Sequence, residues 1–116
     1  MGKESGMNLP QKVKRWKGKI AQATTAAPTV GLVLENTFNG TLALGRTSAG
    51  IYTFTLTGEF STTKTICRMT CTGAAGRLFN YAITSADVLT TAIFDAATPS
   101  AADSGNFDLE IEVYQD

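Results

Sequence analysis

Apolar and polar residues alternate through much of the chain, which is the pattern of strands with one buried face. In the segment 107–114, FDLEIEVY, apolar side chains alternate with acidic ones. In 51–57, IYTFTLT, tyrosine, phenylalanine and leucine alternate with threonine. Because successive side chains of a strand point to opposite faces, both segments predict strands with one apolar face turned inward.

Turn residues divide the remainder into further short strands, giving about eight in all. The other expected strands are 12–22, 30–36, 41–46, 64–72, 78–84 and 88–95. The run 30–36, VGLVLEN, is apolar at consecutive positions and predicts a strand covered on both faces. Pro28 before it confines a local strand to a sheet edge. Asn39-Gly40 after it is a strong hairpin signal.

Two segments allow finer expectations. In 64–72 the better core candidates are Cys67, Met69 and Cys71, which share one face of the expected strand. In the segment 85–97, SADVLTTAIFDAA, residues 88–95 read as a strand that follows SAD. A short helix capped by Ser85 or Asp87 is the alternative, and the β-branched residues in this segment favour the strand.

These elements predict an all-β chain: a single-domain antiparallel β-sandwich, jelly-roll-like, with about eight strands. The length of 116 residues fits one domain. Residues 1–10 read as an N-terminal arm that ends at Pro10, and residues 11–116 as the sandwich. The segment 96–106 is the longest expected loop.

The charges are unevenly distributed, although the net charge is zero. Six cations fall within the first nineteen residues and acids accumulate near the end. One interpretation is a nucleic-acid contact, because clustered lysines neutralise phosphates. The favoured interpretation is that the first and last strands lie close together, within or between subunits. The candidate contact residues for assembly or a partner are Lys12, Lys14, Arg15, Trp16, Lys17 and Lys19.

The residues of ordinary active sites are scarce. Histidine is absent, which removes most nucleophilic triads, proton shuttles and the commonest metal ligand. Cys67 and Cys71 are about 13 Å apart if they lie on a strand, which is too far for a disulfide, and both are expected as buried, reduced thiols. The segment 73–77, GAAGR, reads as a turn and not as a phosphate loop. We therefore expect no enzyme activity, no cofactor and no metal. No apolar run reaches the length of a membrane-spanning helix.

A resemblance rests on the segment 27–66, APTVGLVLENTFNGTLALGRTSAGIYTFTLTGEFSTTKTI. It resembles a pattern in small β-rich virion proteins of tailed bacteriophages and prophages, and in uncharacterised proteins of Bacteroidetes. The likeness extends over residues 11 to about 70. The residues that carry it are Arg46, Gly50, Tyr52, Gly58 and Phe60. These are packing and turn residues, so the resemblance implies no reaction and no catalytic residue.

The resemblance implies a structural protein of the virion, such as a capsid decoration, head-fibre or tail-fibre-associated module, assembled in the cytoplasm of the bacterial host. The expected partners are further copies of the chain, with a trimer favoured, and other virion proteins. Two alternatives stay open. One is a sandwich that binds a host receptor or a carbohydrate through loops such as 73–77 and 96–106. The other, less favoured, is a nucleic-acid binder that uses Lys12 to Lys19.

Overall fold

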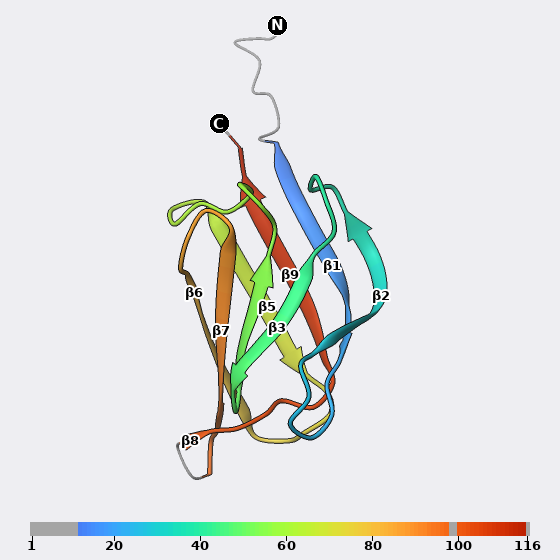
Figure 1. Cartoon of the computed structure of the whole chain (residues 1–116), viewed down its shortest axis with the longest axis vertical. Coiled ribbons are helices and arrows are strands. Elements are labelled where there is room, and N and C mark those ends of the chain that lie inside the picture. Colours follow the sequence, from blue (N-terminus) through green and yellow to red (C-terminus); the bar gives the residue numbers. More distant parts are fainter. Residues whose placement is uncertain (1–11, 98–99, 116) are drawn as a thin grey trace, which may run out of the picture.

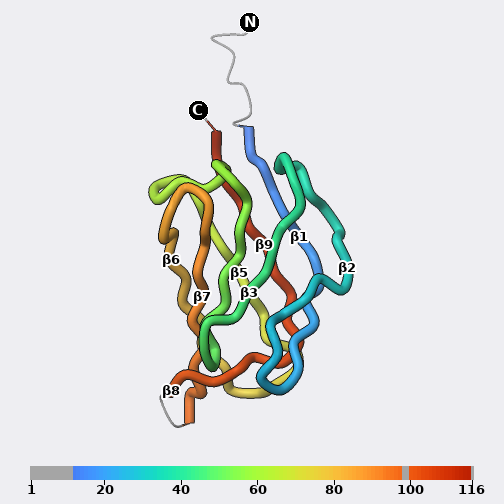
Figure 2. The backbone as a smooth tube through the Cα atoms, in the orientation of Figure 1, coloured from blue at the N-terminus to red at the C-terminus, as the bar shows by residue number. Residues whose placement is uncertain are grey.

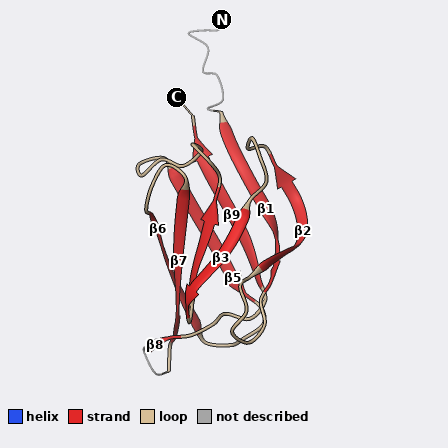
Figure 3. Cartoon of the chain, viewed as in Figure 1, coloured by secondary structure: helices blue, strands red, loops and turns tan. Residues whose placement is uncertain are grey.

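Nine β-strands and no helix make up the described part of the chain, residues 12–97 and 100–115 of the computed structural model (Figures 1 and 3). The expected arm at 1–10 lies outside the described residues. The strands are β1 (Val13–Ala21), β2 (Thr29–Asn36), β3 (Ala43–Ser48), β4 (Ile51–Thr55), β5 (Thr65–Cys71), β6 (Arg77–Ile83), β7 (Val88–Asp95), β8 (Ser100–Ala101) and β9 (Phe107–Tyr114).

The strands form two antiparallel sheets that pack face to face. The first sheet has the order β2-β1-β9-β5, and the second has the order β3-β4-β7-β6 with β8 paired to β7. The chain passes back and forth between the sheets, as the tube in Figure 2 shows, and the last strand returns beside the first. The structure is therefore the expected all-β antiparallel sandwich of two sheets.

An aromatic and aliphatic core fills the space between the sheets. The ring of Phe107 on β9 stacks on Tyr52, with centroids 6.0 Å apart, and meets Phe54 edge-on at 6.4 Å. Such pairs stabilise a core beyond the area that they bury. Leu89 and Ile93 of β7 are fully buried beside them. The alternating residues of 51–57 and 107–114 thus supply the inner faces, as their pattern predicted.

The sequence placed the strands well. All eight expected strands are present, and 88–95 is a strand, so the helical alternative is wrong. The two-residue strand β8 lies inside the segment expected as a long loop. The hairpin expected at Asn39-Gly40 is also wrong, because β2 and β3 belong to different sheets and this segment crosses between them.

The expected burial of β2 on both faces is wrong as well. Every residue of β2 except Glu35 is exposed, and Leu34 retains 64% of its accessible surface. The reason is its position: β2 is an edge strand that pairs only with β1. An edge position agrees with Pro28, which immediately precedes the strand.

Gly50, in the turn between β3 and β4, lies too close to neighbouring backbone atoms to carry a side chain. Its φ is +71°, and an added Cβ would lie 2.5 Å from the carbonyl oxygen of Ile93 and 2.6 Å from that of Ala102. Gly58 also has a φ of +71°, but open space surrounds its Cβ position. We expect Gly58→Ala to lower the free energy of unfolding by about 1–2 kcal/mol through backbone strain alone. Gly50→Ala should cost about 1–3 kcal/mol more because of the steric conflict.

Urea denaturation of both variants measures this difference. Equal losses in the two variants would contradict the close approach at Gly50.

Candidate functional site

The outer face of the first sheet carries alternating rows of opposite charge. Here this charged face means the outward residues of β1 (Arg15, Lys17, Lys19), β9 (Asp108, Glu110, Glu112) and β5 (Arg68, Thr70). The register sets Arg15, Lys17 and Lys19 directly opposite the three acids of β9. The favoured interpretation of the uneven charges, that the first and last strands lie side by side, is confirmed within one chain.

Glu112 is the centre of this network. Its carboxylate accepts hydrogen bonds from Arg15 Nη2 at 2.7 Å and Nε at 2.9 Å, and from Arg68 Nη1 at 2.7 Å. Its side chain is only 7% exposed. The hydrogen bonds from Arg68 and then from Arg15 lower the pKa of Glu112. Such charge-assisted bonds to a largely buried carboxylate are stronger than surface ion pairs, so Glu112 joins three strands.

The lysines of the basic segment are paired or solvated. Lys14 Nζ donates to Glu59 at 2.9 Å, and Lys19 Nζ to Asp108 at 3.0 Å. Lys12 and Lys17 are exposed. A phosphate group would have to compete with carboxylates for Lys14, Arg15 and Lys19. This arrangement does not favour the nucleic-acid alternative, which requires cations available to a backbone.

Trp16 requires a correction as a partner-contact candidate. Its side chain is 1% exposed and belongs to the core. The period-two pattern turns Trp16 inward together with Ile20, while the cations between them face outward. It is therefore not available for stacking on a base or a sugar.

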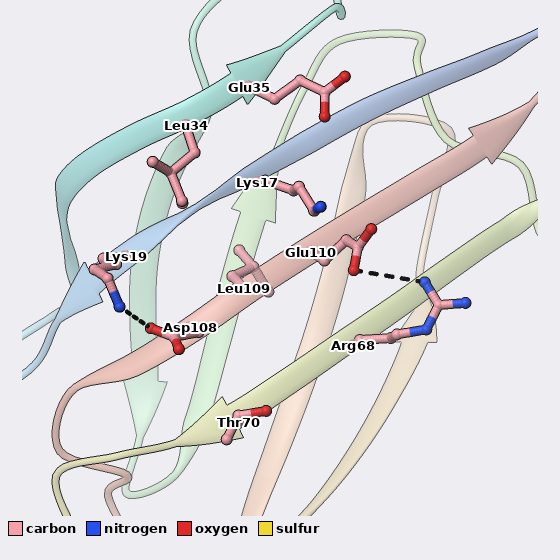
Figure 4. Close-up of a pocket in the computed structure, with 10 residues that line it drawn as sticks. Lys17, Lys19, Leu34, Glu35, Arg68, Thr70, Asp108, Leu109 and Glu110 are labelled. Carbon is pink, nitrogen blue, oxygen red and sulfur yellow. Dashed lines mark hydrogen bonds and ion pairs between the residues drawn. The ribbon is translucent and has the colours of Figure 1, made fainter.

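A shallow recess of about 500 Å³ lies on the charged face. Lys19, Arg68 and Glu110 line it, and Leu34 of β2 stands at its rim (Figure 4). The charges are paired in rows, Lys19 with Asp108 and Arg68 with Glu110 at 3.8 Å. The recess therefore offers donors and acceptors of both signs to a polar ligand, and no single strong field.

A second polar cluster converges on Asp103, in the segment before β9. Arg46 of β3 forms a fork on this carboxylate, from Nε at 3.0 Å and Nη2 at 2.8 Å. The N–H of Gly50 donates to it at 2.9 Å and the hydroxyl of Tyr52 at 3.0 Å. The same Tyr52 oxygen accepts from the N–H of Ser104 at 3.0 Å. Three of the residues that carry the resemblance thus meet at one carboxylate.

Asp103 is saturated with donors and is a structural anchor. The hydrogen bond from Arg46, followed by those from Gly50 and Tyr52, lowers its pKa to about 2 against the effect of burial. An acid–base catalyst needs a pKa near the working pH and an open hydrogen-bonding position, and Asp103 has neither property. Gly58 and Phe60, the other two residues that carry the resemblance, also have structural contacts. Gly58 donates its N–H to Asp87 at 2.7 Å, and Phe60 is buried against Phe38.

The two cysteines are free thiols, as expected. Cys67 is buried, which raises its pKa to about 12. Cys71 is only half-buried, so the expectation of burial holds fully for Cys67 alone, and burial raises the pKa of Cys71 too. Within 12–97 and 100–115, no group of three histidine, cysteine or carboxylate residues could hold a metal ion. The same part of the chain has no helix long and apolar enough to cross a membrane.

No protein-family model, curated protein or solved structure matches this chain. The resemblance to phage virion proteins therefore stays a prediction.

The sequence missed the two carboxylates on which these clusters are centred. Asp103 was one small polar residue in an apparent loop, and Glu112 one of three similar acids on a strand. The signal that pointed toward Asp103 was indirect: an arginine, a glycine and a tyrosine at 46, 50 and 52 with no acid near them in the sequence. Their partner lies more than fifty residues away, and Arg46 and Asp103 are 57 positions apart.

Removing the charge at Asp103 should destabilise the fold. We expect Asp103→Asn to lower the free energy of unfolding by about 1–3 kcal/mol, because Arg46 loses its carboxylate partner in a largely buried place. Asp108→Asn is the matched control, since the side chains of Lys19 and Asp108 are 60% and 47% exposed. It should change stability by less than about 0.5 kcal/mol. Chemical denaturation checks both variants, and equal effects would contradict the anchoring role.

The stability of the chain should also fall in acid. A carboxyl group whose pKa is lowered in the folded state stabilises the fold above its unfolded pKa, and this contribution is lost as pH falls through the folded value. For Asp103 the window runs from its ordinary pKa of 3.8 down to about 2. The unfolding midpoint measured at several pH values should fall less steeply across this window in Asp103→Asn than in the wild type. Parallel curves would show that Asp103 is not the titrating anchor.

Proposed function

We propose that this chain is a non-enzymatic structural protein of a tailed-phage particle, a capsid decoration or a fibre-associated module, that acts through contacts between copies and with other virion proteins. Two features of the described residues support a role in protein contacts. One is a sheet face without charged residues, and the other is a set of exposed apolar side chains on edge strands. The resemblance of residues 11 to about 70 supplies the phage context.

The observation that carries this proposal is the outer face of the second sheet. Its outward positions, set by the register of β3, β4, β6 and β7, hold no charged residue. This uncharged face consists of Ala43, Gly45, Ile51, Thr53, Thr55, Leu78, Asn80, Ala82, Val88, Thr90, Ala92 and Phe94. A solvated sheet face ordinarily presents polar side chains in alternation with its core residues, but only Thr53, Thr55, Asn80 and Thr90 of this face are polar.

The composition of the uncharged face suits a partner surface. Alanine, glycine and threonine are short, so a second protein surface could approach the sheet closely. Charged residues are depleted in the cores of protein interfaces because desolvating an unpaired charge is costly. Charged side chains instead line the outer face of the opposite sheet, where they pair with each other. This segregation supports a protein with one face for contact.

A second candidate function is binding of a host receptor or a carbohydrate. The observation in its favour is the recess of about 500 Å³ on the charged face, which has both polar lining and the exposed Leu34. Loss of glycan or host-cell binding in Lys17→Ala, with particle association unchanged, would support this function.

Particle association provides the test of the main proposal. The chain is to be expressed with its neighbouring genes, and assembled particles are to be purified by sedimentation. We expect the double variant Thr53→Lys, Asn80→Lys to fold with a stability close to that of the wild type, because both positions face outward and their strands, β4 and β6, are not neighbours. It should nevertheless be lost from the particles, since two unpaired cations would have to be buried in the contact.

Thr57→Lys is the control, because Thr57 lies in an exposed turn outside the uncharged face. It should associate with particles like the wild type. A wild-type chain that never sediments with particles would refute the proposed function.

A further inference from the structure

The large apolar side chains that remain exposed lie only on edge strands, as far as the chain is described. Four belong to β2: Val30, Leu32, Val33 and Leu34, which are 37–64% exposed. The other three belong to the opposite side of the sandwich: Ile66 of β5, and Leu78 and Tyr81 of β6. Figure 1 shows β2 and β6 at opposite sides of the molecule. One chain therefore has two apolar edges that face away from each other.

The β2 edge has the sequence of a buried strand without its cover. Residues 29–34 carry no charge, and a consecutive apolar run of this kind is typical of a strand packed on both sides. Exposed edges are ordinarily protected by lysine or by inward-pointing charges. Two register shifts against β1 interrupt β2, which makes its outward backbone irregular. A partner would therefore be held mainly by the side chains of β2 and less by a regular ladder of backbone hydrogen bonds.

The β6 edge has a recess lined in part by apolar side chains. Leu78, Phe79 and Phe94 line a recess of about 400 Å³. Phe79 stacks on Tyr81 with their centroids 6.0 Å apart, so the aromatic surface continues along the strand. Asp95 also lines this recess, and its carboxylate pairs with Arg77 at 3.8 Å. The recess therefore presents no net charge to the uncharged run of β2.

We infer that the β2 edge of one copy packs against the β6 edge of a second copy, head to tail, and that this contact closes into a ring. The reason for choosing a second copy is that each chain brings one of each edge. Head-to-tail contact covers both edges of every subunit, whereas one foreign partner would leave the other edge exposed. A contact between two different patches is heterologous: it gives a ring when the rotation between copies closes and an open filament when it does not. We choose the ring because it covers both edges of every copy, whereas a filament leaves one apolar edge exposed at each end.

Closure strengthens a contact that also forms between two open chains. Each subunit of a closed ring is held by two contacts, so release of one contact leaves the other in place and effective concentration favours its return. This inference deepens the proposed function by naming the surfaces that join the copies. It predicts a ring of at least three chains, and three is the number that the resemblance implies.

The first experiment measures mass in solution by light scattering for the whole chain and two edge variants. Leu34→Lys changes the β2 edge and Leu78→Lys the β6 edge. Both side chains are among the most exposed apolar groups, at 64% and 59%, so neither substitution disturbs the core. We expect a ring for the wild type and at least about a tenfold weaker association for each variant. Thr57→Lys, away from both edges, should keep the mass of the wild type.

The second experiment mixes the two variants and separates head-to-tail contact from a symmetric one. Leu34→Lys keeps an intact β6 edge, and Leu78→Lys keeps an intact β2 edge. An equimolar mixture should therefore form a complex of two chains, one of each variant, although each variant alone is a monomer. Circular dichroism and a thermal melt of each variant confirm that it is folded.

Several results would overturn the inference. These are a monomeric or dimeric wild type, an edge variant that keeps the ring, or a mixture that stays monomeric. The inference and the proposed function fail separately. A ring that is lost in the edge variants but never sediments with particles would refute the virion role alone. A chain that sediments with particles but is a monomer in solution would refute the ring alone.

Discussion

The pairing of the first strand with the last holds the sandwich together. β9 is the strand between β1 and β5, so without it the first sheet would separate into the β2–β1 pair and the single strand β5. Its inner face supplies Phe107, which contacts both Tyr52 and Phe54 of the opposite sheet. Its outer face supplies Glu112, which binds the arginines of both neighbouring strands. The strand β9 thus contributes to both the core and the charged face. Its neighbour in the sheet, β1, is at the other end of the sequence.

The Asp103 cluster extends this dependence to the second sheet. Asp103 lies shortly before β9, and its donors come from β3, from β4 and from the turn between them. Its own carbonyl oxygen accepts from Arg77 Nε of β6 at 3.0 Å. The segment that leads into the last strand is therefore fastened to the opposite sheet before the strand begins. A saturated carboxylate in such a place favours one register and one path of the chain over alternatives, because leaving any of its partners unpaired costs free energy.

The two sheets differ in the residues that they expose on their outer faces. On the outer face of the first sheet, cations and carboxylates neutralise each other in rows. The second sheet has an uncharged outer face, and the apolar side chains left over lie at the two edges. In a single copy of the chain these surfaces are exposed to water and contribute no free energy of burial. Contact with other protein surfaces is the state in which they would contribute free energy, and this is the common basis of both proposals.

The sequence alone determined the strands and their inner faces, because period two in side-chain direction is a local property of an extended chain. It also indicated that the basic start and the acidic end belong together. Only the tertiary structure decided which strands are neighbours, since Asn39-Gly40 has the same local chemistry in a hairpin and in a crossing between sheets. The tertiary structure also decided that β2 is exposed. An apolar run shows that burying its side chains is favourable, but not whether residues of the same chain bury them. Finally, the tertiary structure selected Asp103 and Glu112 among several similar acids, because partners distant in sequence determine which carboxylates become anchors.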